Sequence, residues 1–267
     1  MNILAKNERT VPMHPVLLIA RAAVIETLRR RDLYVLLILS LLFVMGIFVV
    51  VLVGVENPPT ANFLLNLGMS LAFLFAQILT LATGLRHIPG ELENKTIYPL
   101  LAKPLKKSHY LLGKWIATSS SGLFALCIFL VLGYVPVPKM QDYNSILLLQ
   151  TIALYGFSLL LLSSVAIFLS LVFPKAVNLI LLLALIFAGG KLMTLAGFHA
   201  SSGIVGKVAI WAVGYIPNFS LLNLTTRYTD GIGALSPWEF LGLLIYASIF
   251  TMIFLMFSVK LLKRRSL

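Results

Sequence analysis

The feature that most constrains this chain is a series of long apolar runs without a single Asp, Glu, Lys or Arg. Five such runs are Leu33–Val55, Ala61–Leu85, Trp115–Val137, Ile146–Phe173 and Phe240–Val259. An apolar stretch of about 18 residues or more can cross the hydrocarbon core of a bilayer as a helix. Each run is therefore predicted to be a transmembrane helix.

A sixth run, about Ala176–Phe198, contains one charged residue, Lys191, near its end, where a long side chain can reach the headgroups. Of the 267 residues, 60% are hydrophobic and only 11% charged, against about 25% charged in a soluble domain. A β-barrel would need short alternating segments, whereas these runs are apolar on every side. We expect an all-α integral membrane protein with six spans, forming a single domain over residues 1–267.

The distribution of positive charge predicts the orientation. With six spans both termini lie on one side, and the segments on that side (1–32, 86–114, 174–175 and 260–267) hold 17 of the 21 Lys and Arg. The positive-inside rule places these segments in the cytoplasm. The expected location is the plasma or inner membrane, and the basic residues are expected to bind anionic lipid rather than nucleic acid.

Residues 15–31, PVLLIARAAVIETLRRR, precede the first span and have a helical pattern. The predicted apolar face consists of Val16, Ile19, Ala20, Ala23, Val24 and Leu28. Pro15 suits the first position of a helix. We expect an interfacial elbow helix, with Arg29, Arg30 and Arg31 at the membrane surface. A cytoplasmic extension of the first span is the alternative.

Catalytic chemistry is not evident in the sequence. The four His lie outside the spans or at their ends, too scattered for a metal site, and Ser119–Ser121 lack a nearby base. That Ser cluster is expected to allow close helix packing, and the lone Cys127 to be an apolar packing residue. No Gly-Lys pair has the spacing of a P-loop. We expect no enzyme activity, cofactor or metal in this chain.

Between the fifth and sixth spans, residues 199–236 are predicted to lie outside the cytoplasm. Their longest apolar patch, Ile204–Ile216, is too short to span and suits a re-entrant or interfacial helix that Pro217 and Asn218 end. Asn218-Phe-Ser220 and Asn223-Leu-Thr225 match the glycosylation sequon. The predicted cytoplasmic tripeptide 94–96 matches it too, so the pattern carries little information.

Residues 86–114 form a charged insert between the second and third spans. Glu91 and Glu93 suit the first turn of a short helix, and Glu91 can pair with Lys95. Pro99 and Pro104 are expected to interrupt it, with Ser108 as N-cap of a helix that runs into the third span. The apolar residues Leu92, Ile97, Leu100 and Leu101 would suit contact with a protein, although a solvated loop is the alternative.

The sequence ELENKTIYPLLAKP at 91–104, followed by YLLGKW at 110–115, resembles the segment after the second span in ABC-2-type permeases, the membrane subunits of ABC exporters. The similarity lies in the Glu, the Thr-hydrophobic pair, the Leu-Leu-x-x-Pro step and the Gly-Lys that enters the third span. The arrangement of spans is also similar. Here Lys106 and Lys107 stand where a basic residue commonly follows the Pro.

The resemblance implies a division of labour. Two permease subunits, identical or homologous, would form the pathway, and two copies of a separate ATPase subunit would bind ATP and Mg²⁺. The insert would be the coupling helix that contacts the ATPase. The residues to which the resemblance assigns this role are Glu91, Leu92, Glu93, Thr96, Ile97, Leu100 and Pro104.

The leading hypothesis is therefore a permease subunit that exports a lipid-like or amphiphilic substrate. A non-transporting scaffold of an ABC-like assembly complex would use the same coupling helix. An ion-driven carrier is the third reading, but it usually requires an ionisable residue deep in a span, and the sequence places none there.

Overall fold

The computed structural model describes residues 15–28, scattered positions between 34 and 49, and residues 58–87, 107–134, 145–198 and 216–264. This part of the chain contains helices and no strands. The elements are α1 (Pro15–Leu28), α3 (Pro58–His87), α6 (Lys107–Tyr134), α7 (Ser145–Val172), α8 (Lys175–Phe198), the 3₁₀ helix η1 (Phe219–Leu222), α10 (Thr226–Thr229) and α11 (Pro237–Arg264).

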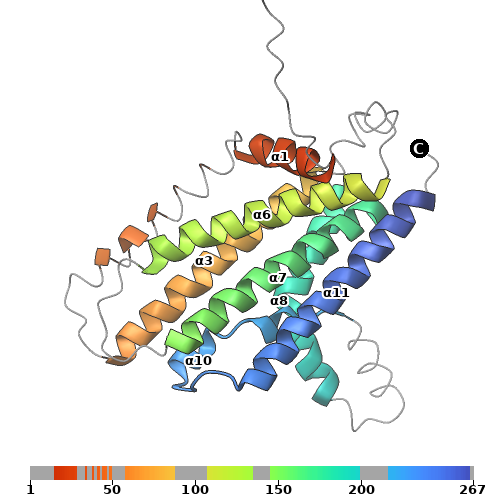
Figure 1. Cartoon of the computed structure of the whole chain (residues 1–267). Coiled ribbons are helices and arrows are strands. Elements are labelled where there is room, and N and C mark those ends of the chain that lie inside the picture. Colours follow the sequence, from red (N-terminus) through yellow and green to blue (C-terminus); the bar gives the residue numbers. More distant parts are fainter. Residues whose placement is uncertain are drawn as a thin grey trace, which may run out of the picture.

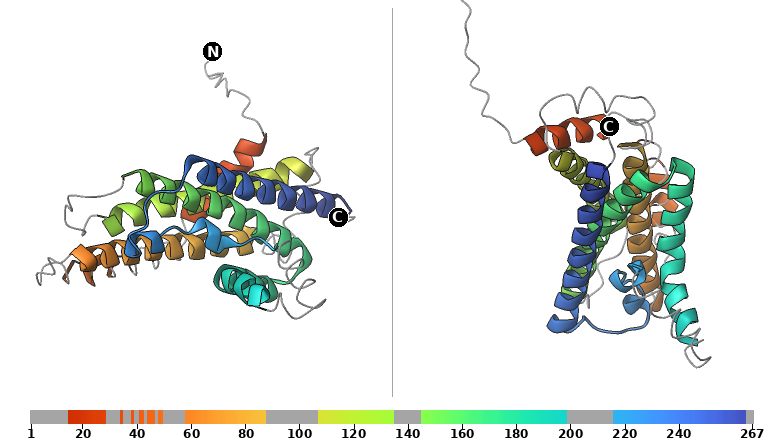
Figure 2. Two further views of the ribbon diagram at one scale, coloured as in Figure 1. Left: turned by 90° about the horizontal axis from the view of Figure 1, so that it is seen from below. Right: turned by 90° about the vertical axis from the view of Figure 1, so that its right-hand side faces the viewer.

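Four long helices, α3, α6, α7 and α11, run side by side, and α8 packs against α3 and α7 (Figure 1). The short helix α1 lies across one end of this bundle and contacts α6 (Figure 2). We call this end, where α6 begins and α11 ends, the α1 end. The opposite end is the one where α7 and α11 begin.

The predicted spans are confirmed in part. Four helices contain segments long and apolar enough to cross a membrane: Asn66–Arg86, Lys107–Val131, Ser145–Val172 and Pro237–Arg264. The apolar part of α8 whose side chains are described, Lys175–Phe187, is shorter than a span. In the first predicted span, scattered positions from Tyr34 to Val49 are helical. The count of six spans stays a prediction.

Helix α1 has the apolar face that the sequence predicts. Ala20 and Ala23 are buried, and Val16, Ile19 and Val24 are partly buried, whereas Arg21 is exposed. Leu17, Leu18 and Ile25 are exposed as well, so the outward face is mixed rather than polar. The position of α1 in the interface between lipid and water stays a prediction.

Two helix boundaries differ from the sequence prediction. Helix α6 begins at Lys107, so the predicted N-cap Ser108 lies within its first turn. Helix α11 begins at Pro237, three residues before the predicted span. Ser236 and Glu239 explain this start, because the Glu239 carboxylate accepts from the Ser236 backbone N–H (3.1 Å) and the Ser236 Oγ accepts from the Glu239 N–H (3.3 Å). This is a capping box with Pro at the first helical position.

The contact of α3 with α6 and α7 depends on small residues. A Cβ on Gly122 of α6 would overlap the Thr80 hydroxyl of α3, and a Cβ on Gly84 of α3 would lie 3.0 Å from the Ala166 Cβ of α7. The Ser121 hydroxyl of α6 lies 3.3 Å from the Thr83 hydroxyl of α3. The prediction that the Ser cluster allows close packing is confirmed at Ser121.

Cys127 is the residue for which the packing prediction is wrong. Its side chain is exposed on the surface of α6 rather than buried between helices. A small, weakly polar thiol is compatible with a helix surface that contacts lipid.

Candidate functional site

The α1 end carries the candidate site, because α6 begins there at Lys107, within the last part of the charged insert, residues 86–114. Helix α1 crosses the second turn of α6 in close contact. A Cβ placed on Gly113 would lie 2.8 Å from the Ile19 Cβ and 3.1 Å from the Val16 carbonyl oxygen. Only a residue without a side chain allows the two backbones to approach so closely. Gly113 therefore sets the position of α1 on α6.

The first turn of α6 is also bound to the last turn of α11. The Lys107 Nζ donates to the Leu262 carbonyl oxygen at 3.4 Å. The last carbonyls of a helix lack intrahelical partners, and a nearby cation both satisfies one and complements the helix dipole. This bond joins the residue at which α6 begins to the C-terminal end of α11.

A small apolar cluster lies beneath these two contacts. Its buried members are Tyr110 and Leu111 of α6, Ile167 and Leu171 of α7, and Leu255 and Leu262 of α11. The cluster joins three helices at the α1 end. We call it, together with the Gly113 and Lys107 contacts, the α1-end junction.

Lys114 is the unusual member of this region. It is only 5% exposed, and its ammonium group lies 5.9 Å from the centre of the Tyr110 ring, within the range of a cation–π interaction. The next residue, Trp115, donates its indole N–H to the Leu160 carbonyl oxygen of α7 at 3.3 Å. The YLLGKW segment at 110–115 thus anchors α6 to α1 and to α7.

The residues predicted to bind the ATPase lie in the part of the insert that is outside the described residues. Arg29, Arg30 and Arg31, which precede the first predicted span, are also outside the described residues. The structure therefore places none of them. The helix into which the insert leads, α6, is described, and its first turns are held by α1, α7 and α11.

At the opposite end, the chain between α8 and α11 forms two turns of the same kind. The Asn218 Oδ1 accepts from the Ser220 N–H (3.0 Å) and hydroxyl (2.7 Å). The Asn223 Oδ1 accepts from the Thr225 N–H (3.1 Å) and hydroxyl (2.7 Å). Both sequon-like tripeptides are thus Asx turns, in which the side chain replaces a backbone partner.

The second of these turns is bound to the bundle. The Tyr155 hydroxyl of α7 donates to the Asn223 Oδ1 at 3.1 Å, and Ser70 of α3 donates to the Thr225 hydroxyl at 3.2 Å. The Tyr155 ring stacks on Phe73 of α3, with centroids 3.9 Å apart. This polar network holds non-helical backbone against the helices, as such backbone within a membrane protein requires.

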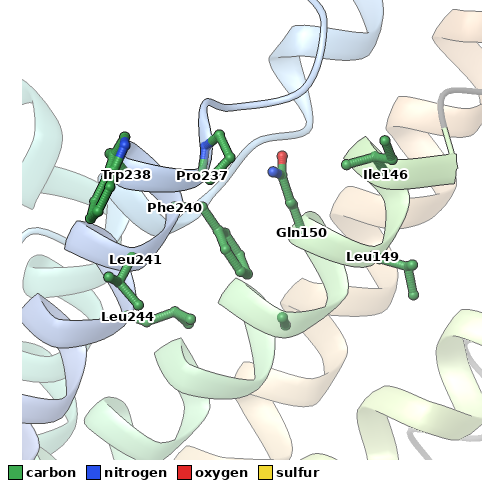
Figure 3. A pocket seen from close by; sticks show the side chains of 9 residues that line it. Ile146, Leu149, Gln150, Pro237, Trp238, Phe240, Leu241 and Leu244 are labelled. Carbon is green, nitrogen blue, oxygen red and sulfur yellow. The ribbon is translucent and has the colours of Figure 1, made fainter.

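An apolar groove opens beside this segment, between the first turns of α7 and α11 (Figure 3). Its volume is about 690 Å³. Gln150 is the polar side chain in its wall, and its amide exchanges two hydrogen bonds with the Leu235 backbone, at 2.8 and 3.0 Å. The groove is lined by Ile146, Leu149, Gln150, Ala153, Pro237, Trp238, Phe240, Leu241 and Leu244.

Several of these contacts are missed by reasoning from the sequence. The Gly-Lys pair at 113–114 belongs to the motif shared with ABC-2-type permeases, but its role as the crossing point of α1 needs the position of Ile19. In the sequence Lys107 is only one of several basic residues near the membrane. The capping box at Ser236–Glu239 is visible in the sequence as S-P-W-E and could have been found.

The comparisons agree with this architecture. The family model described as ABC-2 family transporter protein matches residues 55–260 of the sequence. This range includes α3 to α10, most of α11 and the whole insert. No curated protein matches the chain. Because the match covers well over half of the sequence, the chain belongs to the ABC-2 family of transporter proteins.

Proposed function

We propose that this chain is the permease subunit of an ABC exporter and that its insert, residues 86–114, couples it to a separate ATPase subunit. Membership in the ABC-2 family supports a membrane permease with an ATPase partner in general. The proposal adds the contact residues, Glu91, Leu92, Glu93, Thr96, Ile97, Leu100 and Pro104. ATP and Mg²⁺ would bind to the partner.

The α1-end junction is the observation that carries the proposal. Helix α6 begins three residues after Pro104, and its first turns contact α1, α7 and α11. Packed interfaces of this kind tend to move as units rather than deform continuously. A coupling helix at this place can therefore transmit a movement of the ATPase to the bundle.

The arrangement of the ends supports the proposed orientation. Helix α1 and the basic end of α11, with Lys263 and Arg264 in its last turn, lie at the same end of the bundle (Figure 1). The positive-inside rule would place this end, the insert and both termini in the cytoplasm of a plasma or inner membrane. A second permease subunit, identical or homologous, would complete the pathway, and two ATPase copies would dock beneath.

The proposed substrate class is lipid-like or amphiphilic. The groove between α7 and α11 supports it, because its wall is apolar and the amide of Gln150 is engaged by the backbone. Such a wall would receive hydrocarbon rather than a strongly polar solute.

The test is purification of the tagged chain from its native membrane, alongside a Leu92→Ala/Ile97→Ala variant. Loss of two apolar anchors from an interface commonly costs about 2 kcal/mol or more, a factor of about 30 in affinity. We expect a stoichiometric P-loop ATPase with the wild-type chain and little with the variant. Quantitative mass spectrometry of the eluate measures the ratio.

The matched control is Leu17→Ala/Leu18→Ala, which removes two exposed apolar side chains from α1 at the same end. It should retain the ATPase. A wild-type chain that elutes without any ATPase would contradict the proposal, and so would equal recovery with the Leu92→Ala/Ile97→Ala variant.

A further inference from the structure

A second groove lies at the α1 end, on the side of α11 that faces α6. Its volume is about 420 Å³, within the range of small-molecule sites. Its apolar wall combines one residue of α6 with one stripe of α11. The lining residues are Leu112, Met252, Leu255, Met256, Val259, Lys260 and Lys263.

The charges are confined to the end of the groove. Met252, Met256, Lys260 and Lys263 succeed one another at helical spacing, so the stripe changes from apolar to basic toward the C-terminus of α11. Both Lys side chains are exposed. Among the residues that the structure describes, neither ammonium group has a hydrogen-bond or ion-pair partner. The neighbouring Lys107 is engaged by the Leu262 carbonyl instead.

An apolar stripe that ends in two basic residues matches a phospholipid, which has an apolar acyl chain and a phosphate headgroup. An acyl chain could lie along the Met and Leu side chains, which are adaptable apolar surfaces. A phosphate at the headgroup level would then meet two lysine side chains that extend toward the interface. A zwitterionic headgroup would bring its own cation toward the same two charges. An anionic headgroup lacks this repulsion and gains about 1 kcal/mol for each Lys near the surface, or about fivefold in affinity.

We propose that this groove, which we call the α6–α11 lipid site, binds one anionic phospholipid, with its phosphate at Lys260 and Lys263 and an acyl chain against Met252 and Met256. The site adjoins the α1-end junction, since Leu255 belongs both to the groove and to the buried cluster. A bound lipid would therefore brace α11 against α6. Lipid binding here requires only a membrane around the chain and does not rest on the proposed transport function.

The test uses Trp115 as a reporter, because it packs in the same cluster as Leu112, Leu255 and Val259. In a Trp211→Phe/Trp238→Phe background, Trp115 is the one tryptophan left of the three in the sequence. The full chain is placed in phosphatidylcholine nanodiscs that contain increasing fractions of brominated phosphatidylglycerol or, separately, brominated phosphatidylcholine. Quenching of Trp115 fluorescence reports bromine that lies beside this cluster.

We expect brominated phosphatidylglycerol to quench at a lower mole fraction than brominated phosphatidylcholine. Lys260→Gln/Lys263→Gln should raise the half-quenching fraction of phosphatidylglycerol by about tenfold or more, since two charges are lost. Lys260→Arg/Lys263→Arg should keep the preference, because the charges stay. Arg21→Gln/Lys175→Gln, which removes two exposed charges at the same end but outside the groove, should also keep it.

Three results would overturn the assignment. The first is quenching in which both lipids are equivalent in the wild-type chain. The second is an equal loss of preference in the Arg21→Gln/Lys175→Gln control, which would indicate attraction to the surface as a whole. Inorganic phosphate added to the nanodiscs should leave the quenching unchanged. Displacement by phosphate would show that the lysines bind free anions rather than a lipid held by its chain.

Discussion

A Gly113→Leu variant is expected to release α1 from α6. A Cβ at this position already lies 2.8 Å from the Cβ and Cγ2 of Ile19 and 3.1 Å from the Val16 carbonyl. The carbonyl belongs to the backbone, so a change of rotamer cannot remove the conflict, and the helix itself has to move. Overpacking of this kind costs about 1–3 kcal/mol. The ratio of docked to undocked α1 should fall about five- to 150-fold.

The measurement is the labelling rate of a single cysteine at Ala23, which is 2% exposed on the docked face of α1, in a Cys127→Ser background. A water-soluble maleimide should react slowly with this cysteine in the otherwise wild-type chain. In the Gly113→Leu variant the labelling rate should rise by the factor by which docking is weakened, about five- to 150-fold. Gly242→Leu is the matched control, because a Cβ at Gly242 has nothing within 4 Å. If the labelling rate is unchanged in Gly113→Leu, the close contact of α1 with α6 is contradicted.

A Gly122→Ala variant is expected to destabilise the packing of α3 against α6. The added Cβ would overlap the Thr80 hydroxyl and would lie 3.3 Å and 3.6 Å from the Thr80 Cβ and Cγ2. The 3.3 Å contact is with the Thr80 Cβ, which rotation about χ1 does not move, so a change of rotamer leaves part of the conflict in place. The expected loss of unfolding free energy is about 1–3 kcal/mol, measured as a lower midpoint of thermal unfolding in detergent.

The partner variant makes this prediction specific. Thr80→Ala removes both branches, although it also removes the hydroxyl that donates to the Ala76 carbonyl at 2.8 Å. The Gly122→Ala/Thr80→Ala double variant should therefore be more stable than Gly122→Ala alone. Additive losses in the double-mutant cycle would mean that the two residues are not in contact.

The parts of the fold that could be predicted are those governed by hydropathy. The spans that contain α3, α6, α7 and α11 follow from their apolar runs, because hydrocarbon excludes charge over a length that the bilayer fixes. The docked face of α1 follows from helical periodicity, and Ala20 and Ala23 are buried as the pattern requires. Both signals depend on the local sequence alone.

Contacts between distant residues could not be predicted in this way. The bond from Lys107 to the Leu262 carbonyl joins residues 155 positions apart, and nothing near either residue in the sequence indicates it. The same holds for the hydroxyl of Tyr155 on Asn223. Cys127 is exposed because α6 is buried on one side only, and an evenly apolar run does not show which side that is.

The candidate site has two parts, the insert, which is inferred from the sequence, and the α1-end junction, which the structure describes. The insert with Leu92 and Ile97 rests on the sequence pattern and on family membership. The structure adds the α1-end junction, where Gly113 and Lys107 fix the helix into which the insert leads. Together they make up the proposed mechanical connection, and its two halves can be tested separately.

The most direct test of the central claim is ATP-driven movement of lipid across a membrane. The chain and its co-purified ATPase are reconstituted into vesicles that contain one of a panel of headgroup-labelled fluorescent phospholipids, and dithionite measures the fraction in the outer leaflet. An ABC permease predicts movement of a member of the panel that requires ATP and Mg²⁺ and continues in the presence of an uncoupler. Movement that proceeds without ATP and stops with the uncoupler would contradict the claim and favour an ion-driven carrier. ATP hydrolysis without movement of any labelled lipid would contradict the proposed substrate class.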